Sequence, residues 1–202
     1  MDKEQLLDSV FCILDHSLAI NNQQTSWLRT QADLSFALKH YWSCMKFFMH
    51  LGVVATDYFS EPLTKNVYDD QVYKKMIHSC IQLNLHTQAA VLCQFLEDVD
   101  YPTAFKCLQE RGTCFDAMDA YYRCIWDVTM LEYIINMHHR KGEIEKRNFA
   151  VHLVGKLEMN SNNRADVQYE LSKMKKAQFM RILCQQFLVK TFNEDSTPTL
   201  LH

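Results

Sequence analysis

Apolar residues recur three or four positions apart along most of this 202-residue chain, a spacing that predicts amphipathic helices. The first such stretch, residues 4–20, has an apolar face that is wider than the stripe of a simple surface helix. Such a helix needs neighbours on two sides, so we expect the isolated chain to expose an apolar end if a helical array continues before it. The face consists of Leu6, Leu7, Val10, Phe11, Ile13, Leu14 and Leu18.

Polar and turn-forming residues divide the rest of the chain into further helices, about nine or ten in all. Asp100-Tyr101-Pro102 is typical of a helix start, since Asp accepts from the first amides and Pro needs no amide partner there. We expect loops over 60–69 and 160–163, and a break around Tyr122. The helices that we expect after the first lie in 27–58 (two, divided near His40), 71–83, 87–97, 101–111, 115–140, 143–156 and 164–189.

Short connections between these helices predict antiparallel pairs, as in tetratricopeptide repeats. The second helix of that repeat carries a large residue, a small one three further, a large one four further and an apolar or small one after three more. The small positions are 45 and 58 residues apart rather than about 34, which indicates degenerate repeats with insertions. Three stretches approach the pattern: Tyr41–Cys44–Phe48–Leu51, His86–Ala89–Cys93–Leu96 and Ile144–Arg147–Val151–Val154.

The fold class predicted from these patterns is all-α, with antiparallel helix pairs stacked as a degenerate tetratricopeptide-like α-solenoid. We expect a single helical-repeat domain over 1–190 and a flexible polar tail over 191–202. Composition supports this: only 4 Gly and 3 Pro occur, too few for the turns of a β-sandwich or the glycines of a phosphate loop. With 48% hydrophobic residues, wholesale disorder is not expected either.

The formal net charge is −3, which gives no electrostatic reason to expect nucleic acid as the main partner. No apolar run is long enough to cross a membrane, and the acidic N-terminus does not resemble a signal peptide. The eight cysteines contain no C-x-x-C pair and fall within apolar segments, where they are typical of free thiols in a core. Cys12/His16 and His40/Cys44 have helical spacing, but each pair supplies only two of the four ligands of a structural zinc.

The sequence contains no H-E-x-x-H, P-loop or G-x-S-x-G motif, so we expect no enzyme activity, cofactor or metal site. The run 138–141 (HHRK) precedes Gly142, and we interpret it as cations that favour a helix C-terminus. Single carboxylates, Asp70, Asp100 and Asp116 among them, fit helix capping.

Two groups of residues are candidates for a partner surface. Aromatic side chains of this kind occur at binding hot spots and equally in helix packing. The basic group fits a solvated helix face, a contact with an acidic protein or a contact with RNA. The candidates are the aromatics Tyr121, Tyr122 and Trp126 and the basic residues Lys173, Lys175, Lys176 and Arg181.

Several runs resemble the C-terminal region of the Integrator complex subunit 8 family. The resemblance covers roughly residues 30–190 and is strongest over 68–145. The runs that carry it are 68–72 (YDDQV), 86–96 (HTQAAVLCQFL), 100–110 (DYPTAFKCLQE), 116–122 (DAMDAYY), 125–129 (IWDVT), 131–133 (LEY) and 138–143 (HHRKGE).

The resemblance implies a nuclear, non-catalytic scaffold of the Integrator complex, which processes small nuclear RNA 3′ ends and attenuates transcription by RNA polymerase II. It implies other Integrator subunits as partners and an association with protein phosphatase 2A. Family members are several times longer, so we expect a fragment, a short isoform or a shortened paralogue that lacks most of the phosphatase-docking region. The association with the phosphatase would then be indirect.

Two alternatives remain open: an RNA-binding helical module that uses the basic face, and a general tetratricopeptide-like peptide adaptor. We expect the nucleus as the location, with the cytoplasm as an addition. We expect no membrane contact and no nucleic acid as a direct partner.

Overall fold

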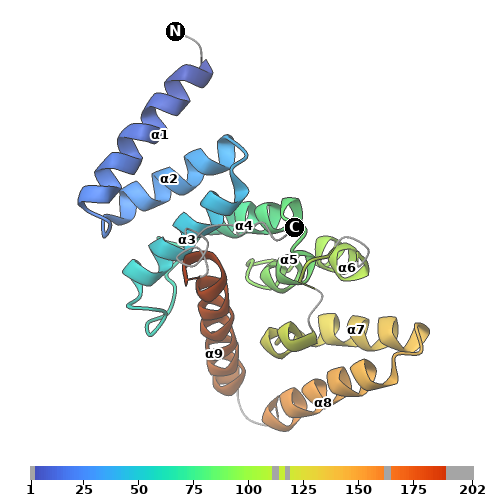
Figure 1. The fold of residues 1–202 in the computed structure, drawn as a ribbon. Helices are drawn as coiled ribbons and strands as arrows, with labels where there is room; N and C mark the ends of the chain where they lie inside the picture. The colour runs from blue at the N-terminus through green and yellow to red at the C-terminus, as the bar shows by residue number, and fades with distance from the viewer. Residues whose placement is uncertain (1–2, 111–113, 117–118, 162–164, 190–202) are drawn as a thin grey trace, which may run out of the picture. The chain divides into compact units, whose positions relative to one another are not determined.

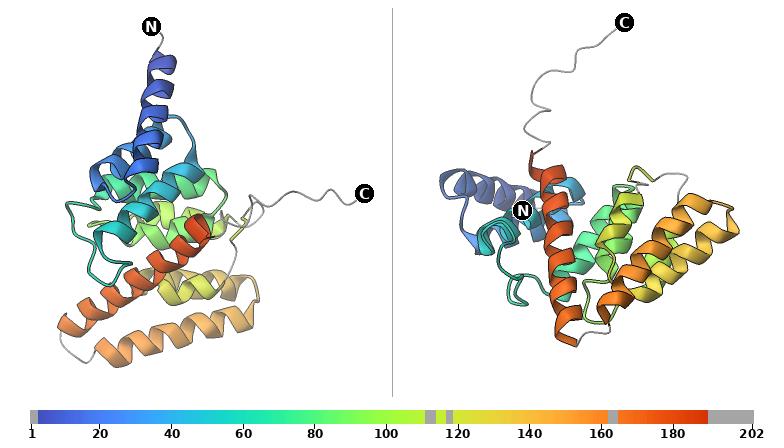
Figure 2. Two further views of the ribbon diagram at one scale, coloured as in Figure 1. Left: turned by 60° about the vertical axis from the view of Figure 1, so that its left-hand side comes forward. Right: turned by 90° about the horizontal axis from the view of Figure 1, so that it is seen from below.

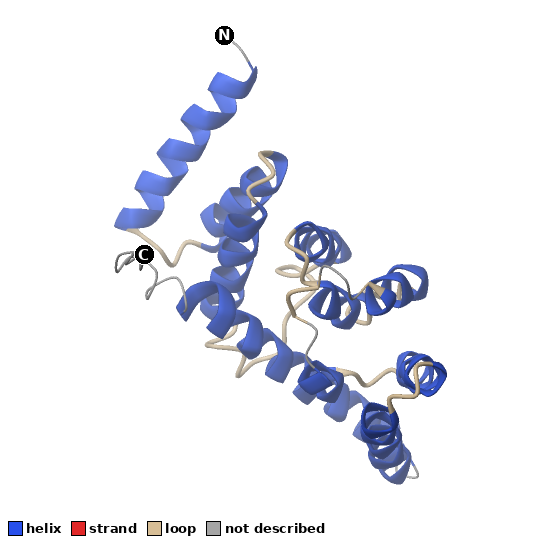
Figure 3. Ribbon diagram, turned by 45° about the vertical axis from the view of Figure 1, so that its right-hand side comes forward, coloured by secondary structure: helices blue, strands red, loops and turns tan. Residues whose placement is uncertain are grey.

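The computed structural model describes residues 3–110, 114–116, 119–161 and 165–189, and every regular element in these ranges is a helix (Figures 1 and 3). The predicted all-α class is confirmed, with nine α-helices in the described part of the chain. Two short elements of other helical type, η1 and η2, accompany them. The elements are α1 (Lys3–Ile20), α2 (Thr25–Ala37), α3 (Tyr41–Ala55), α4 (Asp70–Gln82), α5 (His86–Cys93), α6 (Tyr101–Gln109), η1 (Asp119–Cys124), α7 (Val128–Arg140), α8 (Ile144–Ser161), α9 (Ala165–Cys184) and η2 (Gln185–Val189).

Contacts divide the chain into two compact units. The first consists of Met1–Asp69 and Met180–His202, and the second of Asp70–Phe179, so that α9 contributes residues to both. The single domain that we predict over 1–190 stays a prediction. The tail, 191–202, lies outside the described residues.

The helices pack in pairs, as the repeat pattern predicts: α2 with α3 in the first unit, and α4 with α5 and α7 with α8 in the second (Figure 2). Two residues after the first helix of each pair ends, the chain has a residue in the left-handed region, namely Lys39, Asn84 or Gly142. Each turn is a Schellman motif, in which the next amide reaches back to a carbonyl five residues earlier. These bonds run from His40 N to Ser35 O (2.8 Å), from Leu85 N to Cys80 O (2.8 Å) and from Glu143 N to His138 O (3.0 Å).

The turns are spaced by 45 and 58 residues, the same two intervals that separate the small positions of the predicted repeats. The predicted stretches begin at Tyr41, His86 and Ile144, which are the first residues of α3, α5 and α8. The longer second interval contains α6 and η1. In the second unit α6 packs on α5 and on α7, and η1 contacts α5 and α8.

We expect a helical segment over 115–140 with a break around Tyr122. In the structure Tyr122 lies in η1, and α7 begins only at Val128 after an irregular segment, 125–127. The buried side chain of Gln94 on the preceding helix pair holds this segment. Its Oε1 accepts from the amides of Trp126 (3.0 Å) and Asp127 (3.3 Å), and its Nε2 donates to the carbonyl of Cys124 (3.1 Å). Backbone groups of an irregular segment that would otherwise be buried without partners are thereby paired.

Of the carboxylates considered as caps, which include Asp69 and Asp70, Asp100 and Asp116 accept hydrogen bonds from amides at helix starts. Asp100 accepts from the amide of Thr103 (3.1 Å) at the start of α6, as its sequence predicts. Asp116 does not cap its own segment. It is buried and accepts from the amides of Thr87 (3.0 Å) and Gln88 (2.7 Å), the first turn of α5, 28 or 29 residues earlier in the chain.

A strained turn follows α3 in the first unit, where Asp57, Tyr58 and Phe59 have φ of 45°, 61° and 59°. Three successive residues in the left-handed region are costly without glycine, so other contacts must hold them. The guanidinium of Arg181 on α9 donates to the carbonyls of Tyr58 (3.3 Å) and Phe59 (2.8 Å). The Phe59 ring lies so close to Gly52 that a Cβ there would meet it at 2.6 Å.

The wide apolar face of α1 is exposed only in part. Leu7, Phe11 and Leu14 are half-buried, while Ile13 and Ile20 are 65% and 77% exposed. Leu18 is the residue of this helix that is buried, among those whose side chains the structure describes.

Candidate interaction surfaces

The three candidate aromatics pack within the second unit. Tyr122 is only 3% exposed, and its hydroxyl lies 3.2 Å from Nε2 of the buried His138. The hydroxyl of Tyr121 accepts from Nε2 of Gln88 (3.1 Å), and burial, with the charge of Asp116, raises the pKa of Tyr121 to about 12. The half-buried Trp126 ring lies 5.2 Å from that of Phe95. Tyr122 is therefore a core residue, and Tyr121 and Trp126 are accessible only in part.

The four candidate cations each contact a group of their own unit. The ammonium of Lys175 donates to the carbonyls of Arg123 (2.6 Å) and Ile125 (2.8 Å), and burial lowers the pKa of Lys175. Lys176 lies over the rings of Phe95 and Trp126, 5.6 and 5.3 Å from their centroids.

The remaining two cations of the candidate set have ionic or polar partners as well. Lys173 lies 3.6 Å from a carboxylate oxygen of Glu170, and Arg181 binds the carbonyls of the strained turn. Lys175, Lys176 and Arg181 thus attach α9 to other parts of their own units, whereas Lys173 pairs within α9.

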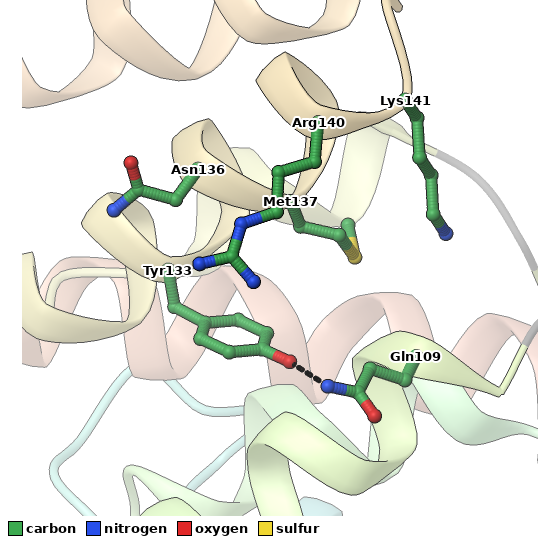
Figure 4. Close-up of a pocket in the computed structure, with 6 residues that line it drawn as sticks. All are labelled: Gln109, Tyr133, Asn136, Met137, Arg140 and Lys141. Atoms are coloured by element: carbon green, nitrogen blue, oxygen red, sulfur yellow. Dashed lines mark hydrogen bonds between the residues drawn. The ribbon is translucent and has the colours of Figure 1, made fainter.

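A cavity of about 400 Å³ lies between α6 and α7 in the second unit, and we call it the α7 cavity (Figure 4). Tyr133 and Met137 supply its less exposed surface, and Phe105 stacks on the Tyr133 ring with centroids 4.0 Å apart. The Nε2 of Gln109 donates to the hydroxyl of Tyr133, so this bond joins the two helices across the cavity. The lining residues are Gln109, Tyr133, Asn136, Met137, Arg140 and Lys141.

The charge of the α7 cavity is positive. Arg140 and Lys141 are exposed, and no carboxylate lines the cavity among the residues that the structure describes. Neither cation has an ion pair within the described part of the chain. In Figure 4 their side chains lie on opposite sides of Met137, with the guanidinium directed toward Tyr133.

The run 138–141, which the sequence presents as one group of helix-end cations, has two different roles. His138 is buried, and its Nδ1 lies 2.5 Å from Oε2 of Glu143, the residue after the Schellman glycine. Arg140 and Lys141 face the α7 cavity instead. Sequence reasoning missed this cavity because its other wall comes from Gln109, which is 24 residues away from Tyr133 and bears no motif.

A second cavity, of about 510 Å³, lies at the other side of α6 and is also within the second unit. Both Lys106 and Glu110 line this cavity, so the charge of its lining is balanced rather than positive. The buried thiol of Cys107 also lines it, and burial raises the pKa of Cys107 to about 11. That thiol is protonated at neutral pH and is a poor nucleophile.

Metal-ligand groupings are absent from the described residues, where no three His, Cys, Asp or Glu side chains gather as a metal site would require. None of the eight cysteines, all of which lie within the described residues, forms a disulfide; Cys12 is exposed and most of the others are buried. Among the described helices, none is both long and apolar enough to span a membrane.

Helix pairs joined by a repeated Schellman turn, with an insertion between two of them, define a helical-repeat protein of the tetratricopeptide type. A family model described as INTS8, TPR repeats matches residues 1–187. The chain belongs to this family of Integrator subunit 8 repeats.

Curated relatives agree with this assignment. The chain is 41% identical to Integrator complex subunit 8 of Homo sapiens over 187 residues, which is 93% of the chain and 19% of the relative. It is 41% identical to the Xenopus laevis protein of that name over 175 residues (87% of the chain, 18% of the relative) and 40% identical to the Mus musculus one over 187 residues (93% and 19%). The chain thus spans about a fifth of the length of these relatives.

Proposed function

We propose that this chain is a non-catalytic scaffold that contributes an interaction surface to the Integrator complex in the nucleus. The observation that carries the proposal is the family match over residues 1–187, supported by 41% identity to human Integrator complex subunit 8. Small nuclear RNA 3′-end processing and attenuation of RNA polymerase II transcription would be activities of the assembly, to which this chain contributes contacts.

The surfaces available for such contacts differ in chemistry. The face of α1 that includes Ile13 and Ile20 is apolar and exposed, which suits burial against another protein. The α7 cavity is positive and polar at its rim. Of the residues proposed from the sequence, only Tyr122 is buried. Arg181 is exposed, and the others are half-buried: Tyr121, Trp126, Lys173, Lys175 and Lys176.

Association with protein phosphatase 2A is proposed only as an indirect one, through other subunits. The chain corresponds to about a fifth of its relatives, and we expect most of the phosphatase-docking region of the family to lie outside that fifth. The scaffold proposal therefore rests on contacts with Integrator subunits first.

Affinity purification of the tagged chain from nuclear extract, followed by mass spectrometry, tests the proposal. Integrator subunits should be recovered, and they should remain after ribonuclease treatment. A matched variant, Ile13→Glu, changes only the exposed face of α1 and shows whether that face makes the contact. Recovery of RNA alone would support the RNA-binding alternative, and recovery of a cytosolic chaperone would support the peptide-adaptor alternative; either result would contradict the scaffold proposal.

A further inference from the structure

We propose that the α7 cavity is a docking site for an acidic segment of a partner polypeptide. The inference deepens the proposed scaffold function and rests on it, because it names the kind of partner that one surface of the scaffold receives. The residues that would do the binding are Arg140, Lys141, Asn136 and Gln109, above Tyr133 and Met137.

The wall of the α7 cavity is held in place by packing and hydrogen bonds. The Tyr133 ring is held on one side by the stacked ring of Phe105, with an interplanar angle of 10°, and at its hydroxyl by Gln109. The α7 helix that carries four of the lining residues is capped by Asp127, whose carboxylate accepts from the amide of Met130 (2.9 Å). The Tyr133 ring is therefore already ordered before binding and adds little to the entropy cost, which falls on the exposed side chains of Arg140 and Lys141.

The positive charge of the α7 cavity favours an acidic ligand. Arg140 and Lys141 can donate only, and an arginine side chain matches a carboxylate with two parallel hydrogen bonds. Both cations are exposed, and no described carboxylate lines the cavity, so a bound acid would not compete with an internal one. The side-chain amide of Asn136 adds a further donor at the rim.

The size and the lining of the α7 cavity suit a short peptide. About 400 Å³ falls within the range of roughly 300–1,000 Å³ that is usual for ligand sites. The Tyr133 ring and the Met137 thioether offer an apolar floor between donors, which suits a peptide that alternates an apolar side chain with carboxylates. The balanced pair Lys106 and Glu110 in the neighbouring cavity provides an internal comparison without such a preference.

The test uses the whole chain and a fluorescein-labelled probe, Gly-Phe-Asp-Glu-Asp-Leu-Gly, titrated by fluorescence anisotropy. A second probe has Asn and Gln in place of Asp and Glu. The acidic probe should bind saturably, and the amide probe should bind about tenfold more weakly or worse, since it loses the charge-assisted bonds. The Met137 methyl resonance, assigned with Met137→Leu, should shift on addition of the acidic probe.

Two variants, with two matched controls, locate the site. Arg140→Glu should weaken binding by about tenfold or more, and Asn136→Asp, which changes size little, by about fivefold, because each places an anion in the cavity. Lys74→Glu, an exposed site on α4, and Lys106→Glu, in the balanced cavity, change the total charge as Arg140→Glu does and should stay within about twofold of wild type. Circular dichroism of each variant verifies folding. If Arg140→Glu is unfolded, Asn136→Asp is the variant that tests the site.

Several results would overturn the inference. The first is that the acidic probe does not bind saturably. The second is that Arg140→Glu and Lys74→Glu weaken binding of the acidic probe equally. The third is that oligouridylate displaces the probe while the Met137 signal does not change. Purification of Arg140→Glu from nuclear extract separates this failure from failure of the scaffold proposal. Recovery of Integrator subunits by a chain that binds no acidic probe would leave the scaffold intact and remove only the docking site.

Discussion

The helices α5 and α8 follow the same Schellman turn and occupy equivalent places in their pairs, yet they differ sharply in burial. Each of the eight residues of α5 is buried, including the polar His86, Thr87 and Gln88. In α8, by contrast, Ile144 is 61% exposed and Val151 is 49% exposed. Val151 is the eighth residue of α8, and its equivalent in α5, Cys93, is fully buried.

The difference comes from the neighbours of each helix rather than from its own pattern. The shorter helix, α5, packs against α4, α6 and η1, whereas α8 contacts α7 and η1. Asp116, which precedes η1, also supplies partners for the polar end of α5, because its carboxylate accepts from two of the α5 amides. The turn within a helix pair therefore sets where the second helix begins, and the elements that pack against that helix set how much of it is buried.

Thiol labelling provides the largest expected contrast. In the variant Val151→Cys, the new thiol should react with iodoacetamide about a thousandfold or more faster than Cys93 in the folded chain, because Cys93 reacts only after local opening. Burial also raises the pKa of Cys93, which lowers its thiolate fraction further. Mass spectrometry of each cysteine-containing peptide measures both rates, with the exposed Cys12 as an internal standard.

Denaturant gives the control for that experiment, since both thiols should then react within a few-fold of each other. Comparable rates in the folded chain would contradict the burial difference between α5 and α8.

Removal of the Gln94 side chain tests whether the irregular segment is held by α5. Gln94→Ala leaves two amides and one carbonyl of residues 124–127 without their partner and should cost about 2–3 kcal/mol. Urea unfolding measures the loss, and the amides of Trp126 and Asp127 should exchange hydrogen faster. Gln71→Ala, at an exposed site on α4, is the matched control and should cost less than about 0.5 kcal/mol. Equal costs would show that the segment holds its shape without Gln94.

Gln94 also marks the boundary of what the sequence could predict about the fold. The starts of α3, α5 and α8 follow from apolar spacing and from local turn chemistry, and both depend only on residues close in sequence. The late start of α7 depends on a glutamine more than 30 residues earlier in the chain. Apolar periodicity over 115–140 does not reveal such a contact, so it predicts a break around Tyr122 but not the start of α7 at Val128.

The candidate surfaces follow the same rule. Tyr122 and Lys175 have the residue types of a binding surface, but their partners, His138 and two backbone carbonyls, are distant in sequence and place them in or against the core. The α7 cavity needs the pairing of α6 with α7 before Gln109 meets Tyr133. Residue type alone could identify candidates, and only tertiary neighbours could select among them.

A pair of identical substitutions sharpens the comparison of the two helices. Val91→Ala in α5 removes two fully buried methyl groups and should cost about 2 kcal/mol through lost transfer energy and the cavity left behind. Val151→Ala in α8 removes half-exposed groups and gains helix propensity, so its effect should stay within about 0.5 kcal/mol. Urea unfolding compares the two variants under one condition. A cost for Val151→Ala as large as that for Val91→Ala would mean that α8 is covered in solution.

The smallest expected effects lie in the turns that α5 and α8 share with α3. Gly142 has φ of 70°, and a Cβ at this position would meet nothing within 4 Å, so Gly142→Ala should cost only the conformational term, about 1 kcal/mol. Lys39 adopts φ of 62° without being glycine, so Lys39→Gly should stabilise the chain by up to about 1 kcal/mol. Asn84→Gly should change stability by only a few tenths, because Asn tolerates this region (φ 57°). Thermal unfolding should rank Lys39→Gly above Asn84→Gly and Gly142→Ala last; any other order would show that the three turns, although hydrogen-bonded alike, do not carry the same backbone strain.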